Sequence, residues 1–193
     1  MSNYPVHVAF PGRLIVVGFG SIGQGVLPLI LRHVGIKADQ ITVVTADQSG
    51  QKVAEEYGVR FIRQALTREN FRHVLGPLVG RGDFLLNLSV DVSSVALIQF
   101  CWEKGALYLD TCIEPWPGGY TDPTISPARR TNYALREEAL ALKDSKQRAP
   151  TAVITHGANP GLVSHLVKQA LLNIAADTGV ETAEPGTRAD WAA

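Results

Sequence analysis

Short runs of apolar residues alternate with segments of helical periodicity along most of the chain. The segment from Arg13 to Val17 (RLIVV) is a nearly continuous apolar run that stops at Gly18. Such a run is typical of a strand buried on both faces of a parallel sheet. Similar runs predict further strands at 41–45, 59–62, 83–88, 106–110 and 151–155.

Between these runs, apolar residues recur at helical spacing. In the segment 22–34, Leu27, Ile30 and Leu31 fall on one side of the predicted helix. Ser49 and Thr67 are candidate N-caps for two of the later helices. Those later helices are predicted at 49–57, 67–75, 92–104, 128–143 and 161–175.

This alternation of strand and helix predicts an α/β fold, a Rossmann-type doubly wound parallel sheet of about six strands. Numbered along the chain, the strands are expected in the order 3-2-1-4-5-6. Residues 176–193 are polar and lack a period, so we expect a loose C-terminal tail. We therefore predict a dinucleotide-binding domain at 1–175, followed by a tail (176–193) that is disordered or begins a second domain.

The first predicted strand leads into Gly18-Phe19-Gly20-Ser21-Ile22-Gly23, a G-x-G-x-x-G sequence that opens a helix. In this context Gly18 allows a tight turn, Gly20 lets a pyrophosphate approach the backbone, and Gly23 lets helix and strand pack closely. The helix N-terminus, which includes Ser21 and Ile22, then presents N–H groups to the phosphates. The segment predicts a dinucleotide site.

An acidic residue after the second strand completes this signature. Asp47 follows Gly23 at close to the usual spacing of about 20 residues. Its carboxylate can accept hydrogen bonds from the ribose hydroxyls and would repel a 2′-phosphate, so NAD is favoured over NADP. The competing interpretation is that Asp47 only caps the following turn. Thr45, Ala46 and Gln48 are candidate wall residues for the adenosine half.

Two other classes of protein with a glycine-rich first turn fit less well. Short-chain dehydrogenases use Tyr-x-x-x-Lys, and no tyrosine of this chain has lysine four positions later. Methyltransferases bind a cofactor without a pyrophosphate, so they do not need this glycine spacing.

Polar clusters follow the fourth, fifth and sixth predicted strands, where an open parallel sheet binds its ligands. Asp91 and Asn159 are candidate catalytic residues, although each could instead cap the helix that follows it. Glu114 and Trp116 lie in an irregular loop and have no evident structural role, which makes them functional candidates. His156 is a candidate substrate contact, or it bonds only to the backbone of its turn.

Carboxylates beside an aromatic ring suit a cationic substrate such as an amine. A carboxylate near a nicotinamide can also accept a proton while an amine is oxidised. Glu114 and Asp91 are therefore predicted to act on the substrate, with Trp116 and His156 contributing to its binding.

The composition of the chain limits which partners, metals and cellular locations are expected. The 193 residues carry 18 basic and 18 acidic side chains, so a polyanion such as nucleic acid is a poor partner. The two cysteines, Cys101 and Cys112, fit no zinc pattern, and we expect no metal site. With no signal peptide and no long apolar segment, we expect a cytoplasmic protein without a membrane partner.

Residues from about 10 to 175 resemble the bacterial homospermidine synthases of the saccharopine-dehydrogenase-like superfamily. The similar segments are GRLIVVGFGSIGQGVLPLI, NLSVDVSS, LYLDTCIEPWPGGY and THGANPGLVSHLVKQAL. The resemblance implies tightly bound NAD, held by Gly18, Gly20, Ser21, Ile22 and Asp47. It also implies that Asp91, Glu114 and Asn159 face the diamine and the nicotinamide.

In that family two putrescines become homospermidine and ammonia through oxidation to an imine and its re-reduction, so the enzyme is an aminobutyl transferase. The resemblance also implies a second domain, absent here, that completes the diamine pocket and the contacts of a homodimer. Two alternatives stay open: an oxidoreductase acting on secondary amines, as saccharopine dehydrogenase does, and a non-catalytic NAD-binding module.

Overall fold

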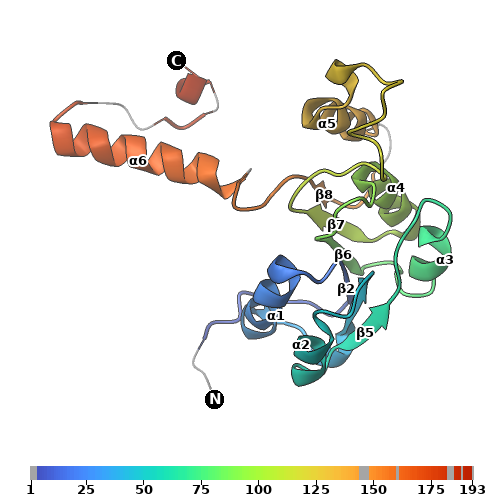
Figure 1. Ribbon diagram of the computed structural model, residues 1–193. Helices are drawn as coiled ribbons and strands as arrows, with labels where there is room; N and C mark the ends of the chain where they lie inside the picture. The colour runs from blue at the N-terminus through green and yellow to red at the C-terminus, as the bar shows by residue number, and fades with distance from the viewer. Residues whose placement is uncertain (1–3, 144–147, 160, 182–184, 188, 193) are drawn as a thin grey trace.

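The computed structural model describes residues 4–143, 148–159, 161–181, 185–187 and 189–192. Its centre is a parallel sheet with the strand order β5-β4-β2-β6-β7-β8 (Figure 1). This arrangement confirms the predicted fold class and the predicted order. The strands are β2 (Leu14–Val17), β4 (Ile41–Thr45), β5 (Arg60–Arg63), β6 (Phe84–Asn87), β7 (Leu107–Asp110) and β8 (Ala152–Val153).

Helices cover both faces of the sheet, as the ribbon shows (Figure 1). The first two helices pack on one face and the next two on the other. A fifth helix packs on the fourth. The helices are α1 (Ser21–His33), α2 (Gln51–Glu56), α3 (Phe71–Leu75), α4 (Ser94–Lys104), α5 (Asn132–Ala141) and α6 (Leu162–Thr178), with 3₁₀ turns η1 (Ala38–Gln40), η2 (Pro127–Arg129) and η3 (Asp190–Ala192).

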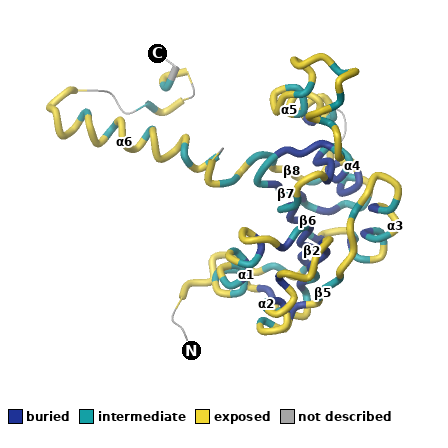
Figure 2. The backbone as a smooth tube through the Cα atoms, in the orientation of Figure 1, coloured by how far each residue is buried: buried dark blue, intermediate teal, exposed yellow. Residues whose placement is uncertain are grey.

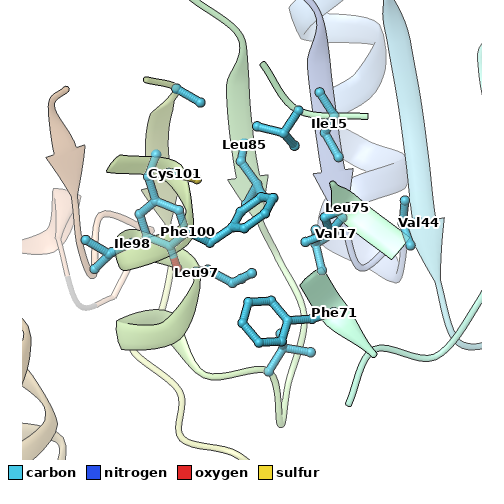
Figure 3. Packing of buried hydrophobic residues seen from close by; sticks show 14 of the residues in the cluster. Ile15, Val17, Val44, Phe71, Leu75, Leu85, Leu97, Ile98, Phe100 and Cys101 are labelled. Carbon is cyan, nitrogen blue, oxygen red and sulfur yellow. The ribbon is translucent and has the colours of Figure 1, made fainter. Parts of the chain in front are cut away.

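The central strand β2 is buried at every position because it carries the core on both sides. Successive strand residues point to opposite faces. Leu14 and Val16 belong to the cluster that includes Leu27 of α1, whereas Ile15 and Val17 belong to the cluster beneath α3 and α4. Figure 3 shows this second cluster, with Phe71 and Phe100 against the sheet. The buried run of β2 therefore fixes the position of Gly18, which follows it.

Two helices start later than predicted because their capping residues are different. Helix α2 begins at Gln51, since the Ser49 side chain bonds to Asp47 instead of capping the helix. The segment predicted as helix 128–143 is divided into η2 and α5, because Thr131 Oγ1 accepts a hydrogen bond from the Ala134 N–H and starts a new helix there. The α3 and α4 segments also start after their predicted positions.

The C-terminal part departs further from the prediction. The strand predicted at 151–155 is only Ala152–Val153, and Thr155 has a positive φ of 57°. Helix α6 continues past residue 175 to Thr178 and ends at Gly179, which is left-handed (φ 70°). The tail predicted to start at 176 therefore starts later. A short parallel pair, β1 (Val8–Ala9) and β3 (Val34–Gly35), was not predicted.

Helix α6 points away from the sheet (Figure 1). Within the described structure, none of its residues is buried, and Figure 2 shows it as a mixture of exposed and intermediate residues. Leu166, Leu171 and Ile174 are apolar side chains more than half exposed. None of the described helices combines the length and the apolar character needed to cross a lipid bilayer.

One buried carboxylate stabilises the end of the sheet where the strands begin, which we call the amino edge. Asp83 accepts hydrogen bonds from the Arg13 backbone N–H (2.8 Å), Arg13 Nη2 (2.7 Å) and the Gly80 N–H (2.7 Å). Burial alone would raise the pKa of Asp83, but these hydrogen bonds outweigh it and hold the pKa below its ordinary value. Asp83 is thus ionised and paired at neutral pH.

We expect Asp83→Asn to lower the free energy of unfolding by about 2 kcal/mol at pH 7, because one buried acceptor becomes a donor that faces other donors. Because the pKa of Asp83 is lowered in the folded state, its ionised carboxylate stabilises the fold fully above the unfolded-state pKa. This stabilisation is lost as the pH falls below about 4. Urea unfolding followed by tryptophan fluorescence measures both effects. The control is Glu137→Gln in the exposed Arg136–Glu137 pair, for which we expect a change below about 0.5 kcal/mol; equal losses in the two variants contradict the prediction.

Candidate functional site

A cavity of about 400 Å³ opens at the end of the sheet where the strands finish, which we call the carboxyl edge. The turns after β2, β4, β5 and β6 surround it. Among its lining residues are Gly18, Gly20, Asp47, Leu66, Ser89 and Asp91. The cavity therefore joins the glycine turn, the acid after the second predicted strand and one of the candidate substrate residues.

The glycine turn has the geometry that its sequence predicts. Gly18 has a φ of 85°, and a Cβ there would lie 2.7 Å from the Ser89 backbone, so only glycine fits. A Cβ on Gly23 would lie 2.9 Å from the Phe19 ring, which is buried in the core. A Cβ on Gly20 would meet nothing within 4 Å, so space remains beside the backbone for a ligand.

Helix α1 begins at this turn, with Gly20 as its N-cap. In the described structure no side chain caps this helix end and no acidic residue lies in its first turn. Ser21 and Ile22 are the first two residues of the helix and both are exposed. The first backbone N–H groups of a helix have no partner within it, so this end fits an anion such as a pyrophosphate.

Asp47 lies just beyond β4 and lines the same cavity. Its Oδ1 accepts hydrogen bonds from the backbone N–H of Ser49 (2.8 Å) and from the Ser49 hydroxyl. These bonds lower the pKa of Asp47, so the carboxylate is charged at neutral pH. Asp47 does brace the following turn, as the competing interpretation held, yet it also faces the cavity. Thr45 and Ala46 line the cavity as well, whereas Gln48 is not among its lining residues.

Asp91 does not cap the helix after it. The N-cap of α4 is Ser93, whose Oγ accepts a hydrogen bond from the Ala96 N–H. Asp91 itself is exposed and has a φ of 62°, a conformation rare outside glycine. A strained, exposed carboxylate beside the cavity is left available for a ligand.

Glu114 lies close to Asp91, although the two come from different turns. Its backbone is fixed to α4, since the Glu114 N–H donates to Ser94 Oγ (3.0 Å) and its carbonyl accepts from the Ser94 N–H (2.9 Å). Burial raises the pKa of the Glu114 carboxyl, and the charges of Asp91 and Asp110 raise it further. Hydrogen bonds from the Cys112 thiol and the Asp91 N–H oppose this rise. A proton acceptor with a raised pKa suits acid–base chemistry.

The other candidate substrate residues differ in their placement. Trp116 packs against Phe71, with ring centroids 5.4 Å apart, and contacts the core. It therefore has a structural role, which was not evident from its position in an irregular loop. His156 and Asn159 are exposed on the turn after β8. Asn159 does not cap α6, because its N-cap is Gly161 and no side-chain cap bond is present; Pro160 lies outside the described residues.

Some residues of the site were not predicted from the sequence. Ser89 packs on Gly18, while Gln64, Ala65 and Leu66 form the wall after β5. Because the third predicted strand neighbours the second in this topology, its C-terminal residues could have been assigned to the cavity. Within the described residues, no group of three or more His, Cys, Asp or Glu side chains could hold a metal ion.

A parallel sheet in this order, with a glycine turn and a charged acid around one cavity, defines a Rossmann-type dinucleotide-binding domain. Residues 14–154 match the family model of the saccharopine dehydrogenase NADP binding domain. The chain belongs to this family.

The similar proteins include homospermidine synthases. The chain is 49% identical to one from Blastochloris viridis, covering 100% of this chain and 41% of the relative, and 45% identical to one from Mesorhizobium japonicum. A crystal structure of the Legionella pneumophila homospermidine synthase in complex with NAD superposes with a TM-score of 0.80 at 46% identity, over 95% of this chain and 38% of that one. The chain thus spans about two-fifths of the length of these relatives.

We expect Glu114→Gln to raise the free energy of unfolding by about 1 kcal/mol at pH 7.5, because it removes a charge that burial and two nearby carboxylates disfavour. Because the pKa of Glu114 is raised in the folded state, the gain in stability of the variant is full above this pKa. The gain disappears as the pH falls below about 4, where the carboxyl is protonated in both the folded and the unfolded state. Urea unfolding at pH 7.5 and at pH 4 checks this prediction. A variant less stable than the unmodified chain at pH 7.5 contradicts it.

Proposed function

We propose that this chain is the NAD-binding part of a homospermidine synthase, an aminobutyl transferase that converts two putrescines into homospermidine and ammonia in polyamine biosynthesis. The proposal is supported by two neighbouring carboxylates: Asp91 lines the dinucleotide cavity, and Glu114, which does not line it, lies next to Asp91. The similarity to homospermidine synthases over the whole chain supports the same function.

The residues around the cavity fit NAD. The N–H groups of Ser21, Ile22 and Gly23 would bind the pyrophosphate, Gly20 leaves room for it, and Gly18 allows the tight turn that precedes the helix. Asp47 would accept hydrogen bonds from the adenosine ribose. Bound NAD would supply the reversible hydride exchange that the overall reaction needs.

The family name mentions NADP, but Asp47 favours NAD. Its carboxylate is ionised and lines the cavity, so a 2′-phosphate would bring two negative charges together. Arg63 lies near Asp47 but its Nη1 donates to Gln48 Oε1 (3.3 Å). We therefore propose NAD as the cofactor of this chain.

Asp91 and Glu114 would bind the diamine. An ammonium group between them lowers the electrostatic cost of two neighbouring carboxylates, which gives the site affinity for a dication. Burial raises the pKa of Glu114, and this carboxylate would accept the proton that the amine loses. Asn159 and His156, exposed on the turn after β8, would contact the diamine from the other side, and the partly buried Trp116 would border it.

The remainder of a full-length synthase would complete this pocket. We propose that it packs on α6, because α6 presents Leu166, Leu171 and Ile174 to solvent and the chain spans only about two-fifths of its relatives. The assembled protein would be a cytoplasmic homodimer whose ligands are small diamines, with neither nucleic acid nor membrane as a partner.

Asp47→Asn should weaken NAD binding about tenfold, because the ribose hydroxyls lose a charged acceptor. The same change should improve NADP binding relative to NAD, since the 2′-phosphate no longer meets a negative charge. Titrations of both nucleotides followed by tryptophan fluorescence measure the two affinities. The matched control is Asp39→Asn, an exposed residue in η1 before β4, at the amino edge, which should change neither affinity. An unchanged preference in Asp47→Asn contradicts the proposed ribose contact.

The activity itself is tested by joining this chain to the C-terminal part of the Blastochloris viridis relative and incubating the fusion with putrescine and NAD. We expect homospermidine and ammonia in equal amounts and no net NADH. Glu114→Gln in the same fusion should reduce the rate at least tenfold, the usual contribution of a general base being at least that large. Stoichiometric NADH would instead indicate an oxidoreductase acting on amines, and NAD binding without turnover would indicate a non-catalytic module.

A further inference from the structure

Asp110 is a fully buried carboxylate at the end of β7, and it has contacts to each of the three turns that carry the candidate catalytic residues. Its Oδ1 accepts a hydrogen bond from the Thr155 N–H (2.6 Å), and its Oδ2 accepts one from the Tyr108 hydroxyl (2.9 Å). The sequence places Asp110 in a polar cluster after a strand, but its contacts extend beyond that cluster.

The first connection is to the turn after β8. Thr155 has a left-handed backbone (φ 57°), which costs a β-branched residue free energy unless its surroundings hold it. The Asp110 carboxylate bonds to the Thr155 N–H, and the Asp110 carbonyl accepts from the His156 N–H (3.1 Å). Asp110 thereby fixes the point at which the chain turns towards Asn159.

The second connection is to the turn after β6. The Asn87 Nδ2 donates to the Tyr108 hydroxyl (3.2 Å), which in turn donates to Asp110. The Asn87 Oδ1 accepts from the Ser89 hydroxyl (2.6 Å), and Ser89 packs on Gly18. This series of bonds fixes the start of the turn that ends at Asp91.

The third connection is to Glu114. Ser94 lies near the Asp110 carboxylate and lowers its pKa, and the Ser94 Oγ accepts a hydrogen bond from the Glu114 N–H (3.0 Å). Ser94 is fully buried at the start of α4, so its position is set by packing. The backbone of Glu114 is therefore held by a buried side chain that lies beside Asp110.

The stability of the fold alone does not explain why a carboxylate occupies position 110. Asp83, the other buried aspartate among the described residues, is neutralised by Arg13, whereas the groups that bond to the Asp110 carboxylate in the described structure are neutral: an N–H and a hydroxyl. Burying a carboxylate without a cation lowers the stability of the fold, and a neutral residue at this position would lower it less. Such a cost is typical of residues retained for the geometry of a site.

We propose that Asp110 is a positioning residue for the diamine site: it holds the turns of Asp91, Glu114 and Asn159 in one arrangement without touching the substrate. This proposal rests on the proposed function. The adjacent strands β6, β7 and β8 (Figure 1) carry the three turns, and β7, the middle strand, ends at Asp110. Substitution of Asp110 should therefore disturb the diamine site and spare the glycine turn.

The test compares Asp110→Asn with Asp83→Asn, a buried aspartate at the opposite edge of the sheet. In the 193-residue chain, we expect Asp110→Asn to bind NAD within threefold of the unmodified chain and to speed hydrogen exchange at the Thr155 and His156 amides at least tenfold. In the fusion, its kcat per folded molecule should fall at least tenfold. Asp83→Asn should be less stable, with the exchange of these amides and kcat within twofold of the unmodified protein.

Tyr108→Phe is a second, nearly isosteric variant that removes one bond to Asp110. We expect it to fold and to lower kcat in the same direction by a smaller factor. The proposal is overturned if Asp110→Asn or, should that variant not fold, Tyr108→Phe leaves kcat and the exchange of both amides unchanged. It is also overturned if Asp83→Asn lowers kcat as much. If the unmodified fusion makes no homospermidine, the proposed function fails, and the exchange of the two amides still tests whether Asp110 positions its turn.

Discussion

The burial of β2 between two helical layers is the constraint on which the rest of the structure depends. Its four residues contribute alternately to the two hydrophobic clusters, so the strand cannot shift without exposing both. Because every strand in the sheet is parallel to it, the turns that follow the strands gather at one edge. The glycine turn, Asp47, Asp91 and Glu114 come together for this reason, although they are far apart along the chain.

The two edges of the sheet treat buried charge in opposite ways. At the amino edge, the buried Asp83 carboxylate accepts four hydrogen bonds, three from Arg13 and one from the Gly80 N–H, an arrangement that stabilises the fold. At the carboxyl edge, Asp110 and Glu114 are buried without a cation among the described groups that bond to them, and Asp91 has a strained backbone. Buried charge therefore stabilises the fold at the amino edge, whereas the carboxyl edge retains unneutralised carboxylates that a cationic ligand can satisfy.

The sequence predicted the sheet and its order because buried parallel strands leave a strong signal, such as RLIVV before Gly18. It predicted the glycine turn and Asp47 because both depend on local spacing. It did not predict the start of α4, since Asp91, Val92 and Ser93 are adjacent and only the tertiary contacts of Ser93 and Ser94 decide which residue caps the helix. The role of Asp110 was also hidden, because its partner Thr155 is 45 positions away in the chain. Trp116 was assigned to the substrate alone because its partner Phe71 comes from a distant helix.

We infer that the carboxyl edge of this chain is a preformed dinucleotide site that does not need the rest of a longer protein. Calorimetric titration of the 193-residue chain with NAD tests it most directly. We expect saturable binding of one NAD per folded chain, with weaker binding of NADP. If circular dichroism shows that the chain is folded and the chain still binds no NAD at millimolar concentration, the inference of a preformed site is contradicted.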